Sequence, residues 1–215
     1  FGDNQERLVE KVRATNPDAV FLTGDLIDSR RYDLQNSLDV VEQIVTFTDV
    51  YYVLGNHEVA VNRIDEIYEA LERLGVQILP NQSLEIERDG ERLTIIGIED
   101  PLMGKEPQQM LDEAMATVDD KSFKILLSHR PEIFETYVEN AVDVVFTGHA
   151  HGGQVRLPFS DGLFAPGQGW FPSQTSGVHE ADETRMVVSR GLGNSVLQQR
   201  LFNLPEIVVV DLKSQ

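Results

Sequence analysis

The sequence predicts an α/β fold in which mixed β-sheets are flanked by helices, and three observations support this. Short apolar runs with the length of buried strands alternate along the chain with amphipathic stretches of helical period. Such alternation favours parallel strands with helices outside the sheet. Alternating residues on both sides of Asp89-Gly90 predict a hairpin, which adds antiparallel pairing. The 215 residues suffice for one sizeable core, so we expect residues 1–215 to form a single domain.

The helices are predicted from apolar residues that recur on one face. Asp3 can cap the first helix, which Asn16-Pro17-Asp18 ends. The next three are expected over about residues 34–47, 61–74 and 108–118, and a shorter one over about 133–138. We expect these helices to form the outer layers.

The strands are predicted from apolar or alternating runs. They are expected at residues 19–22, 50–54, 84–88, 93–98, 124–127, 142–146, 186–189 and 207–210. Residues 153–177 are rich in Gly, Pro and Ser and predict a long loop. We expect Trp170 and Phe171 to pin this loop to the core, the alternative being contact with a lipid or a nucleotide base.

Composition excludes several classes of protein. The formal net charge of -18 argues against nucleic acid as a partner, and so against a nuclease, because phosphate backbones are held by clustered Lys and Arg. The absence of cysteine excludes disulfides and thiolate metal sites. No apolar run reaches the roughly 20 residues that cross a bilayer.

Potential metal ligands directly follow four of the predicted strands. They are Asp25, Asn56 with His57, His129, and His149 with His151. Sites form where the carboxyl ends of such strands meet loops, so we expect these side chains to gather at one edge. Taken singly, each residue is more typical of turn chemistry or of a satisfied polar group. Their shared placement favours a site of oxygen and imidazole ligands, which suits Mn, Fe, Zn or Co better than Ca or Cu(I).

The order of these motifs resembles the calcineurin-like metallophosphoesterase family. The motifs are Gly24-Asp25, Gly55-Asn56-His57-Glu58, His129 and Gly148-His149-Ala150-His151. The runs 148–158 and 189–195 also resemble a bacterial, envelope-associated subgroup that includes Tat-exported or membrane-tethered and UDP-diacylglucosamine pyrophosphatase-like enzymes. The resemblance implies two mixed β-sheets packed as a sandwich with flanking helices. It also implies a location in the bacterial cell envelope or at a membrane, the alternative being the cytoplasm.

The resemblance implies one complete and one incomplete metal site. Asp25 would bridge two divalent metals, with Asn56, His129 and His149 completing one site and His151 serving the other. The family's first motif, Asp-x-His, is absent from this sequence. We expect that the sequence starts just after that motif, so that the fold lacks its first strand. The alternative is a protein that binds one metal, since Asp25 and His151 alone are too few ligands to hold an ion firmly.

The resemblance further implies a reaction. A hydroxide bridging the two metals would hydrolyse a phosphate ester or pyrophosphate of a small-molecule or lipid-linked substrate. His57 would assist the phosphate and protonate the leaving group, with Glu58 as its orienting partner. The alternative is a weak or inactive scaffold with at most one metal site. His57 argues against a scaffold, whereas the absent motif argues for it; the oligomeric state is left open.

Two charged residues near these motifs have open roles. Asp100 follows the predicted hairpin, and we expect it to form a turn before Pro101 and not to help a metal site. Arg130 lies beside His129 and could meet a phosphate oxygen or form a surface ion pair.

Overall fold

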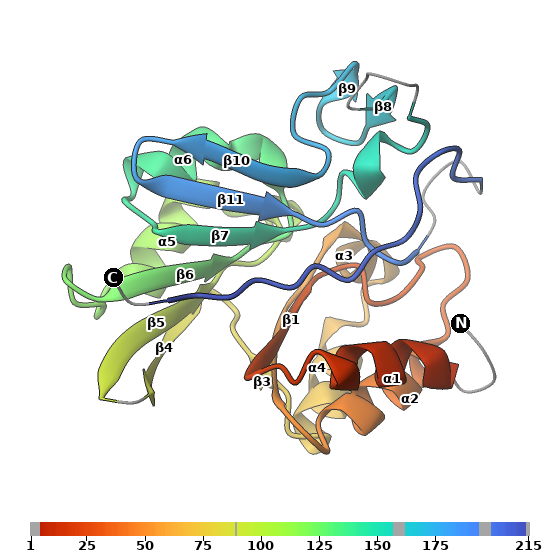
Figure 1. Ribbon diagram of the computed structural model, residues 1–215, viewed down its shortest axis with the longest axis horizontal. Coiled ribbons are helices and arrows are strands. Elements are labelled where there is room, and N and C mark those ends of the chain that lie inside the picture. Colours follow the sequence, from red (N-terminus) through yellow and green to blue (C-terminus); the bar gives the residue numbers. More distant parts are fainter. Residues whose placement is uncertain (1–4, 89, 157–161, 194–198, 214–215) are drawn as a thin grey trace.

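A computed structural model describes residues 5–88, 90–156, 162–193 and 199–213. One half of the molecule is a three-stranded parallel sheet in the order β1 (Ala19–Thr23), β2 (Asp49–Val53), β3 (Gln77–Ile78). The helices α1 (Glu6–Ala14), α2 (Leu34–Ile44) and α4 (Ile64–Arg73) lie beside this sheet (Figure 1). The apolar faces of these helices and the strands form one buried cluster. Because each helix buries only one face, its sequence shows the amphipathic pattern from which it was predicted.

The other half is a six-stranded mixed sheet. Its order is β10 (Gly177–Ala181), β11 (Thr184–Val188), β7 (Val144–Thr147), β6 (Phe123–Leu127), β5 (Glu91–Gly97), β4 (Gln82–Arg88). The four central strands run parallel, while β4 and β10 pair antiparallel to their neighbours. The helices α5 (Pro107–Met115) and α6 (Phe134–Glu139) share a second buried cluster with this sheet. The predicted hairpin is confirmed as β4 and β5, although Asp89 itself lies outside the described residues.

A third buried cluster joins the two sheets. Phe21 of β1 contacts Tyr51 of β2 and Phe146 of β7, with ring centroids 5.7 and 5.1 Å apart. Residues of β2, β5 and β6 fill the same layer. The predicted α/β sandwich is therefore confirmed.

Two predicted elements differ in the structure near the site. The helix expected over 61–74 is α4, and a separate short helix, α3 (Asn56–Val61), begins where a loop was expected. Gly55 precedes α3 in an extended conformation, and Asn62 ends it with a φ of 53°. This left-handed residue breaks the helical path between α3 and α4, which the spacing of apolar residues does not reveal.

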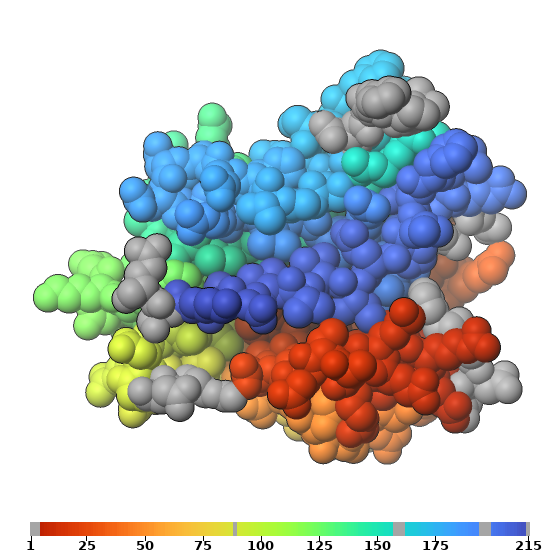
Figure 2. Space-filling model, viewed as in Figure 1, coloured from red at the N-terminus to blue at the C-terminus, as the bar shows by residue number. Residues whose placement is uncertain are grey.

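The predicted strand at 207–210 is wrong, because these residues form no strand in the structure. The segment runs along the surface between the two halves of the molecule, as the dark blue atoms of Figure 2 show. Val208 and Val209 are 39% and 58% exposed. A high β-propensity does not provide a neighbouring strand, and none of the described strands pairs with this segment.

The long loop contains two short paired strands, β8 (Phe164–Ala165) and β9 (Gly169–Trp170). Trp170 contacts the ring of Phe164, at 5.6 Å between centroids. However, Trp170 and Phe171 are 68% and 75% exposed, so the expectation that they pin the loop to the core is wrong.

Candidate metal centre

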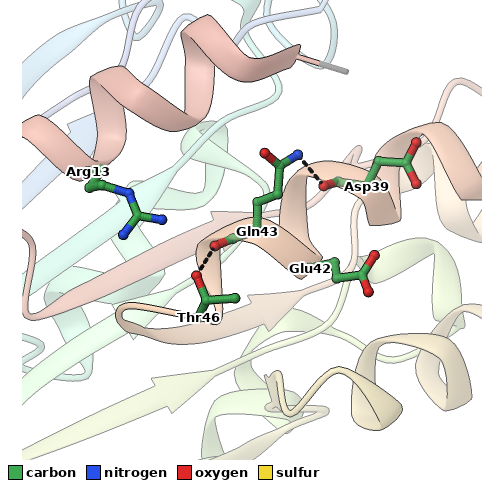
Figure 3. A pocket seen from close by; sticks show the side chains of 5 residues that line it. All are labelled: Arg13, Asp39, Glu42, Gln43 and Thr46. Carbon is green, nitrogen blue, oxygen red and sulfur yellow. Dashed lines mark hydrogen bonds between the residues drawn. The ribbon is translucent and has the colours of Figure 1, made fainter. Parts of the chain in front are cut away.

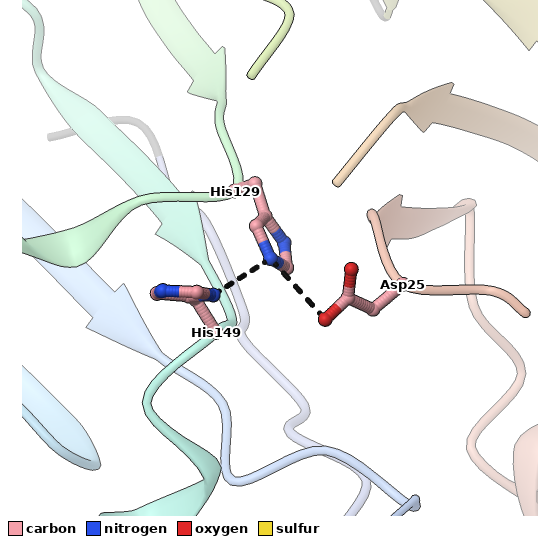
Figure 4. Close-up of side chains that lie close together, drawn as sticks. All are labelled: Asp25, His129 and His149. Atoms are coloured by element: carbon pink, nitrogen blue, oxygen red, sulfur yellow. Dashed lines mark hydrogen bonds and ion pairs between the residues drawn. The ribbon is translucent and has the colours of Figure 1, made fainter. Parts of the chain in front are cut away.

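Four strand ends place the predicted ligands at one edge of the sandwich. Asp25 follows β1, Asn56 begins α3 directly after β2, and His129 and His149 follow β6 and β7. The first two strands belong to the smaller sheet and the other two to the larger sheet. Figure 4 shows Asp25, His129 and His149 pointing toward one another across this junction.

The donor atoms converge on Nε2 of His129. Oδ1 of Asn56 and Nδ1 of His149 each lie 3.0 Å from it, and Oδ2 of Asp25 lies 3.4 Å from it. Ligand atoms about 2.1 Å from a tetrahedral ion are about 3.4 Å apart. The four atoms therefore fit one divalent transition metal, and the mixed oxygen and imidazole set suits the metals expected from the sequence.

Backbone contacts fix the ring of His129. Its Nδ1 lies 2.7 Å from the carbonyl oxygen of Thr23, the last residue of β1, and donates to it. Nε2 is thereby the nitrogen that faces the cluster, and the side chain is only 1% exposed. Burial lowers the pKa of His129, but the charge of Asp25 and the hydrogen bonds to Asp25 and Thr23 together outweigh it and leave this pKa above the usual value. A cation at this position is stabilised by Asp25, which is the electrostatic condition of a metal site.

The loops after β1 and β2 touch each other through two glycines. A Cβ atom added to Gly55 would lie 2.5 Å from Oδ1 of Asp25, and one added to Gly24 would lie 2.5 Å from the backbone nitrogen of Gly55. Gly24 also has a φ of 90°, which is costly for other residues. The glycines of both motifs are thus needed for the close approach that places Asp25 beside Asn56.

Glu58 holds these two loops together. Its carboxylate accepts hydrogen bonds from the backbone nitrogens of Gly55, Asp25 and Ile27, at 2.8, 2.9 and 3.1 Å. The residue is 1% exposed, and burial together with the charge of Asp25 raises its pKa. The sequence led us to expect Glu58 as the orienting partner of His57; its three hydrogen bonds instead go to the backbone.

His57 is oriented by residues that were not predicted from the sequence. Its Nδ1 accepts a hydrogen bond from the backbone nitrogen of Ser29 at 3.1 Å and lies 3.9 Å from Oδ1 of Asp28. In the neutral ring the proton is therefore on Nε2, which lies 3.9 Å from Oδ2 of Asp25. The signal in the sequence was Asp28, three residues after Asp25, whose carboxylate can accept from Nδ1 when the ring is protonated on both nitrogens.

The two histidines of the Gly148-His149-Ala150-His151 motif differ. His149 and His151 both have left-handed backbones, with φ of 60° and 48°, so the sharp turn falls on the histidines themselves. Strain of this kind is typical of functional sites. Nδ1 of His151 is buried and has no hydrogen-bond partner among the described residues. The carbonyl oxygen of His151 accepts from Asn203, 52 residues later in the chain. Nothing in the sequence around Asn203 indicated this contact.

Burial keeps both imidazoles neutral. It is the main cause that lowers the pKa of His149 to about 2 and of His151 to about 4. For Asp25, burial raises the pKa, but the charges and hydrogen bonds of His129 and His57 together lower it by more. The pKa of Asp25 is therefore below its usual range. Neutral imidazoles beside a carboxylate are ready to accept a metal ion without first losing protons.

Asp100 and Arg130 form a buried ion pair beside the cluster. Asp100 is fully buried and accepts from Nε and Nη2 of Arg130 at 2.6 and 3.0 Å. Its Oδ1 also accepts from the backbone nitrogen of Leu102, so the expected turn is present as the start of a short helix, Pro101–Met103. Nη1 of Arg130 lies 3.0 Å from Nε2 of His149. Arg130 is thus in an ion pair, although a buried one.

A surface hollow between α1 and α2 contains none of these side chains. Figure 3 shows its lining, formed by Arg13, Asp39, Glu42, Gln43 and Thr46. Gln43 donates to the carbonyl oxygen of Asp39, and Thr46 donates to that of Gln43. These are ordinary contacts within a helix, and none of the proposed metal ligands lines the hollow. We therefore assign the candidate site to the convergent donor atoms and not to this hollow.

Comparisons with known proteins identify the family of this chain. The profile of the family described as calcineurin-like phosphoesterase matches residues 3–153. An uncharacterized metallophosphoesterase of Campylobacter jejuni, Cj0846, is 32% identical over 214 residues, which cover 98% of this chain and 54% of that protein. The phosphodiesterase YaeI of Escherichia coli is 26% identical over 202 residues, covering 91% of this chain and 70% of that protein. The NAD nucleotidase of Haemophilus influenzae shares the fold, with a TM-score of 0.53 and 19% identity over 87% of this chain and 38% of that one.

The described residues include no helix that is both long enough and apolar enough to span a membrane.

The profile covers the strand ends that carry the convergent donor atoms, and it includes His151. This chain therefore belongs to the calcineurin-like phosphoesterase family and is of the phosphoester hydrolase type.

Proposed function

We propose that this protein hydrolyses a phosphate ester or pyrophosphate with the help of a divalent transition metal. The observation that carries the proposal is the convergence of three donor atoms within 3.4 Å of Nε2 of His129. They belong to Asn56, His149 and Asp25, so four side chains would hold one ion. A metal bound there supplies Lewis acidity, which acidifies water and neutralises charge on the phosphoryl oxygens.

The second proposed site contains Asp25 and His151. One carboxylate can serve two ions because its two oxygens can face different metals, and the buried Nδ1 of His151 has no partner in the described part of the chain. With two protein ligands this site is weak. We expect a polypeptide of these 215 residues to hold one ion tightly per chain; two tightly held ions, measured by metal analysis after dialysis, would contradict this assignment.

His57 is the proposed acid. The backbone nitrogen of Ser29 occupies its Nδ1, so a neutral ring presents the proton of Nε2 toward Asp25 and the proposed metal site. This N–H can donate a hydrogen bond to a phosphate oxygen. Transfer of the proton to the leaving group would need the ring protonated on both nitrogens, and the N–H on Nδ1 would then face Asp28, whose Oδ1 lies 3.9 Å away. General acid assistance of this kind contributes about 10²–10⁴-fold to the rate.

The test is hydrolysis of bis-p-nitrophenyl phosphate with Mn²⁺ by the protein and by His57→Ala. We expect metal-dependent turnover that falls at least about 10²-fold in the variant, with metal binding unchanged. His179→Ala is the matched control, because His179 lies on β10, a strand that carries none of the proposed ligands. Equal rates for the protein and His57→Ala would remove His57 from the mechanism.

The competing proposal is a scaffold that binds metal but does not turn over. The chain spans 54% of the length of the Campylobacter jejuni relative, so any substrate assigned to the whole protein is a proposal. Metal binding without hydrolysis of phosphodiesters, phosphomonoesters or pyrophosphates would favour the scaffold.

A further inference from the structure

We propose that Glu132 is a positioning residue, whose carboxylate accepts a hydrogen bond from the Nε2–H of His149 when Nδ1 of that ring binds the metal. This inference rests on the proposed use of His149 as a ligand. Nδ1 of His149 faces the donor cluster, 3.0 Å from Nε2 of His129, and is therefore the ligand atom. A neutral imidazole that gives Nδ1 to an ion carries its proton on Nε2. That N–H then requires an acceptor, because the side chain of His149 is only 4% exposed.

Two charged side chains lie near Nε2 of His149. Nη1 of Arg130 is 3.0 Å away, but a guanidinium has no acceptor and would oppose an N–H at this position. Oε1 of Glu132 is 3.9 Å away and can accept. Arg130 and Glu132 therefore favour opposite arrangements of the ring: Arg130 favours the one with its proton on Nδ1, and Glu132 favours the one that can bind metal.

One carboxylate oxygen of Glu132 is available to accept a hydrogen bond. Its Oε1 accepts from Nη1 of Arg130 at 3.3 Å, while its Oε2 is buried without a hydrogen-bond partner in the described part of the chain. A shift of about 1 Å in the Glu132 side chain would bring Nε2 within hydrogen-bond length. Nη1 of Arg130 has to move back from Nε2 of His149 in this arrangement, because two N–H groups cannot face each other at 3.0 Å. Nε and Nη2 of Arg130 are bonded to buried Asp100, which keeps the guanidinium anchored beside the site.

The fold leaves room for the carboxylate at this place. Glu132 lies in the short helix Pro131–Ile133, which follows His129 directly. Gly167 lies against the same carboxylate, because a Cβ added to Gly167 would overlap Oε1 of Glu132. Gly167 belongs to the turn between β8 and β9, so the long loop closes over Glu132 and confines it near His149. A carboxylate that accepts from a ligand histidine fixes the ring and strengthens the ligand, and its loss typically costs 10–100-fold in metal affinity.

The test is Zn²⁺ affinity, measured by competition with a chromophoric chelator, for four variants. We expect Glu132→Gln to bind about tenfold more weakly and Glu132→Leu, which has no acceptor, up to about 100-fold more weakly. Glu135→Gln is the matched control, because Glu135 is exposed on α6 three residues away, and it should bind as the unmodified protein does. His149→Ala reports the loss of the ligand itself.

A second readout separates positioning from general support of the fold. In the Zn²⁺-loaded protein labelled with ¹⁵N histidine, NMR should show the proton of His149 on Nε2, with the N–H signal shifted by Glu132→Gln. Melting of the metal-free variants should stay close to that of the unmodified protein.

The outcomes distinguish this inference from the proposed function. If Glu132→Gln and Glu132→Leu bind Zn²⁺ as tightly as the unmodified protein while His149→Ala does not, Glu132 has no positioning role and the metal site stands. If the unmodified protein itself fails to bind, the metal site and the proposed function fail together.

Discussion

Replacement of Glu58 by Gln tests whether one buried carboxylate holds the metal-binding loops together. Oε2 of Glu58 accepts from the backbone nitrogens of Asp25 and Gly55, and Oε1 accepts from that of Ile27. The single oxygen of Gln can keep the first pair of bonds, but its amide group then meets the N–H of Ile27, donor against donor. One buried unsatisfied donor costs about 1–3 kcal/mol. Glu58→Ala would orphan three donors, at a cost comparable to a total stability of about 5–15 kcal/mol, and is therefore less informative.

The assay is urea unfolding of the metal-free protein, followed by Zn²⁺ affinity of the folded variant. We expect Glu58→Gln to lower the free energy of unfolding by about 1–3 kcal/mol and to weaken Zn²⁺ binding, because the loops carrying Asp25 and Asn56 separate. Glu72→Gln, at an exposed position of α4, should stay within about 0.5 kcal/mol of the unmodified protein. A Glu58→Gln variant equally close to the unmodified protein would refute the view that Glu58 joins the loops.

Three further outcomes follow from the geometry. Gly55→Ala should abolish tight Zn²⁺ binding in calorimetry because its Cβ would lie 2.5 Å from Oδ1 of Asp25. Gly193→Ala should bind normally, because a Cβ at Gly193 would meet no atom of the described residues within 4 Å. Asp100→Asn should lower the free energy of unfolding by up to about 3–5 kcal/mol in urea, because it leaves a largely buried guanidinium with Glu132, at 3.3 Å, as its charged partner. An unchanged midpoint would contradict this. The pKa of His151 is about 4 in the folded protein against 6.5 in the unfolded chain, a difference of about 2.5 units. Below pH 6.5 the unfolded state therefore binds more protons than the folded state. The free energy of unfolding decreases as the pH is lowered, by up to about 3 kcal/mol near pH 4. The metal-free His151→Gln variant should lose correspondingly less stability between pH 7 and 4, and identical profiles would show that His151 titrates normally in the folded protein.

The sequence by itself determined the layers of the fold and the placement of the candidate site residues after strand ends. Period-2 and period-3.6 patterns depend on which side of an element is buried, so they predicted the sandwich layers and most elements. The site was visible because parallel strands end at a common edge, and the chain places Asp25, Asn56, His129 and His149 directly after strand ends. Local order along the chain was sufficient for these conclusions.

Only the tertiary structure decided which atoms meet. Asp100 and Arg130 are 30 residues apart, and the backbone contacts of Glu58 span 31 and 33 residues, so no local pattern could pair them. The same limit explains residues 207–210, whose β-branched side chains predicted a strand that finds no partner among the described strands. Secondary structure depends on neighbours in the sequence, whereas hydrogen-bond partners and free edges depend on where distant segments pack. The distinct surroundings of His149 and His151, two residues apart in one motif, are a consequence of that packing.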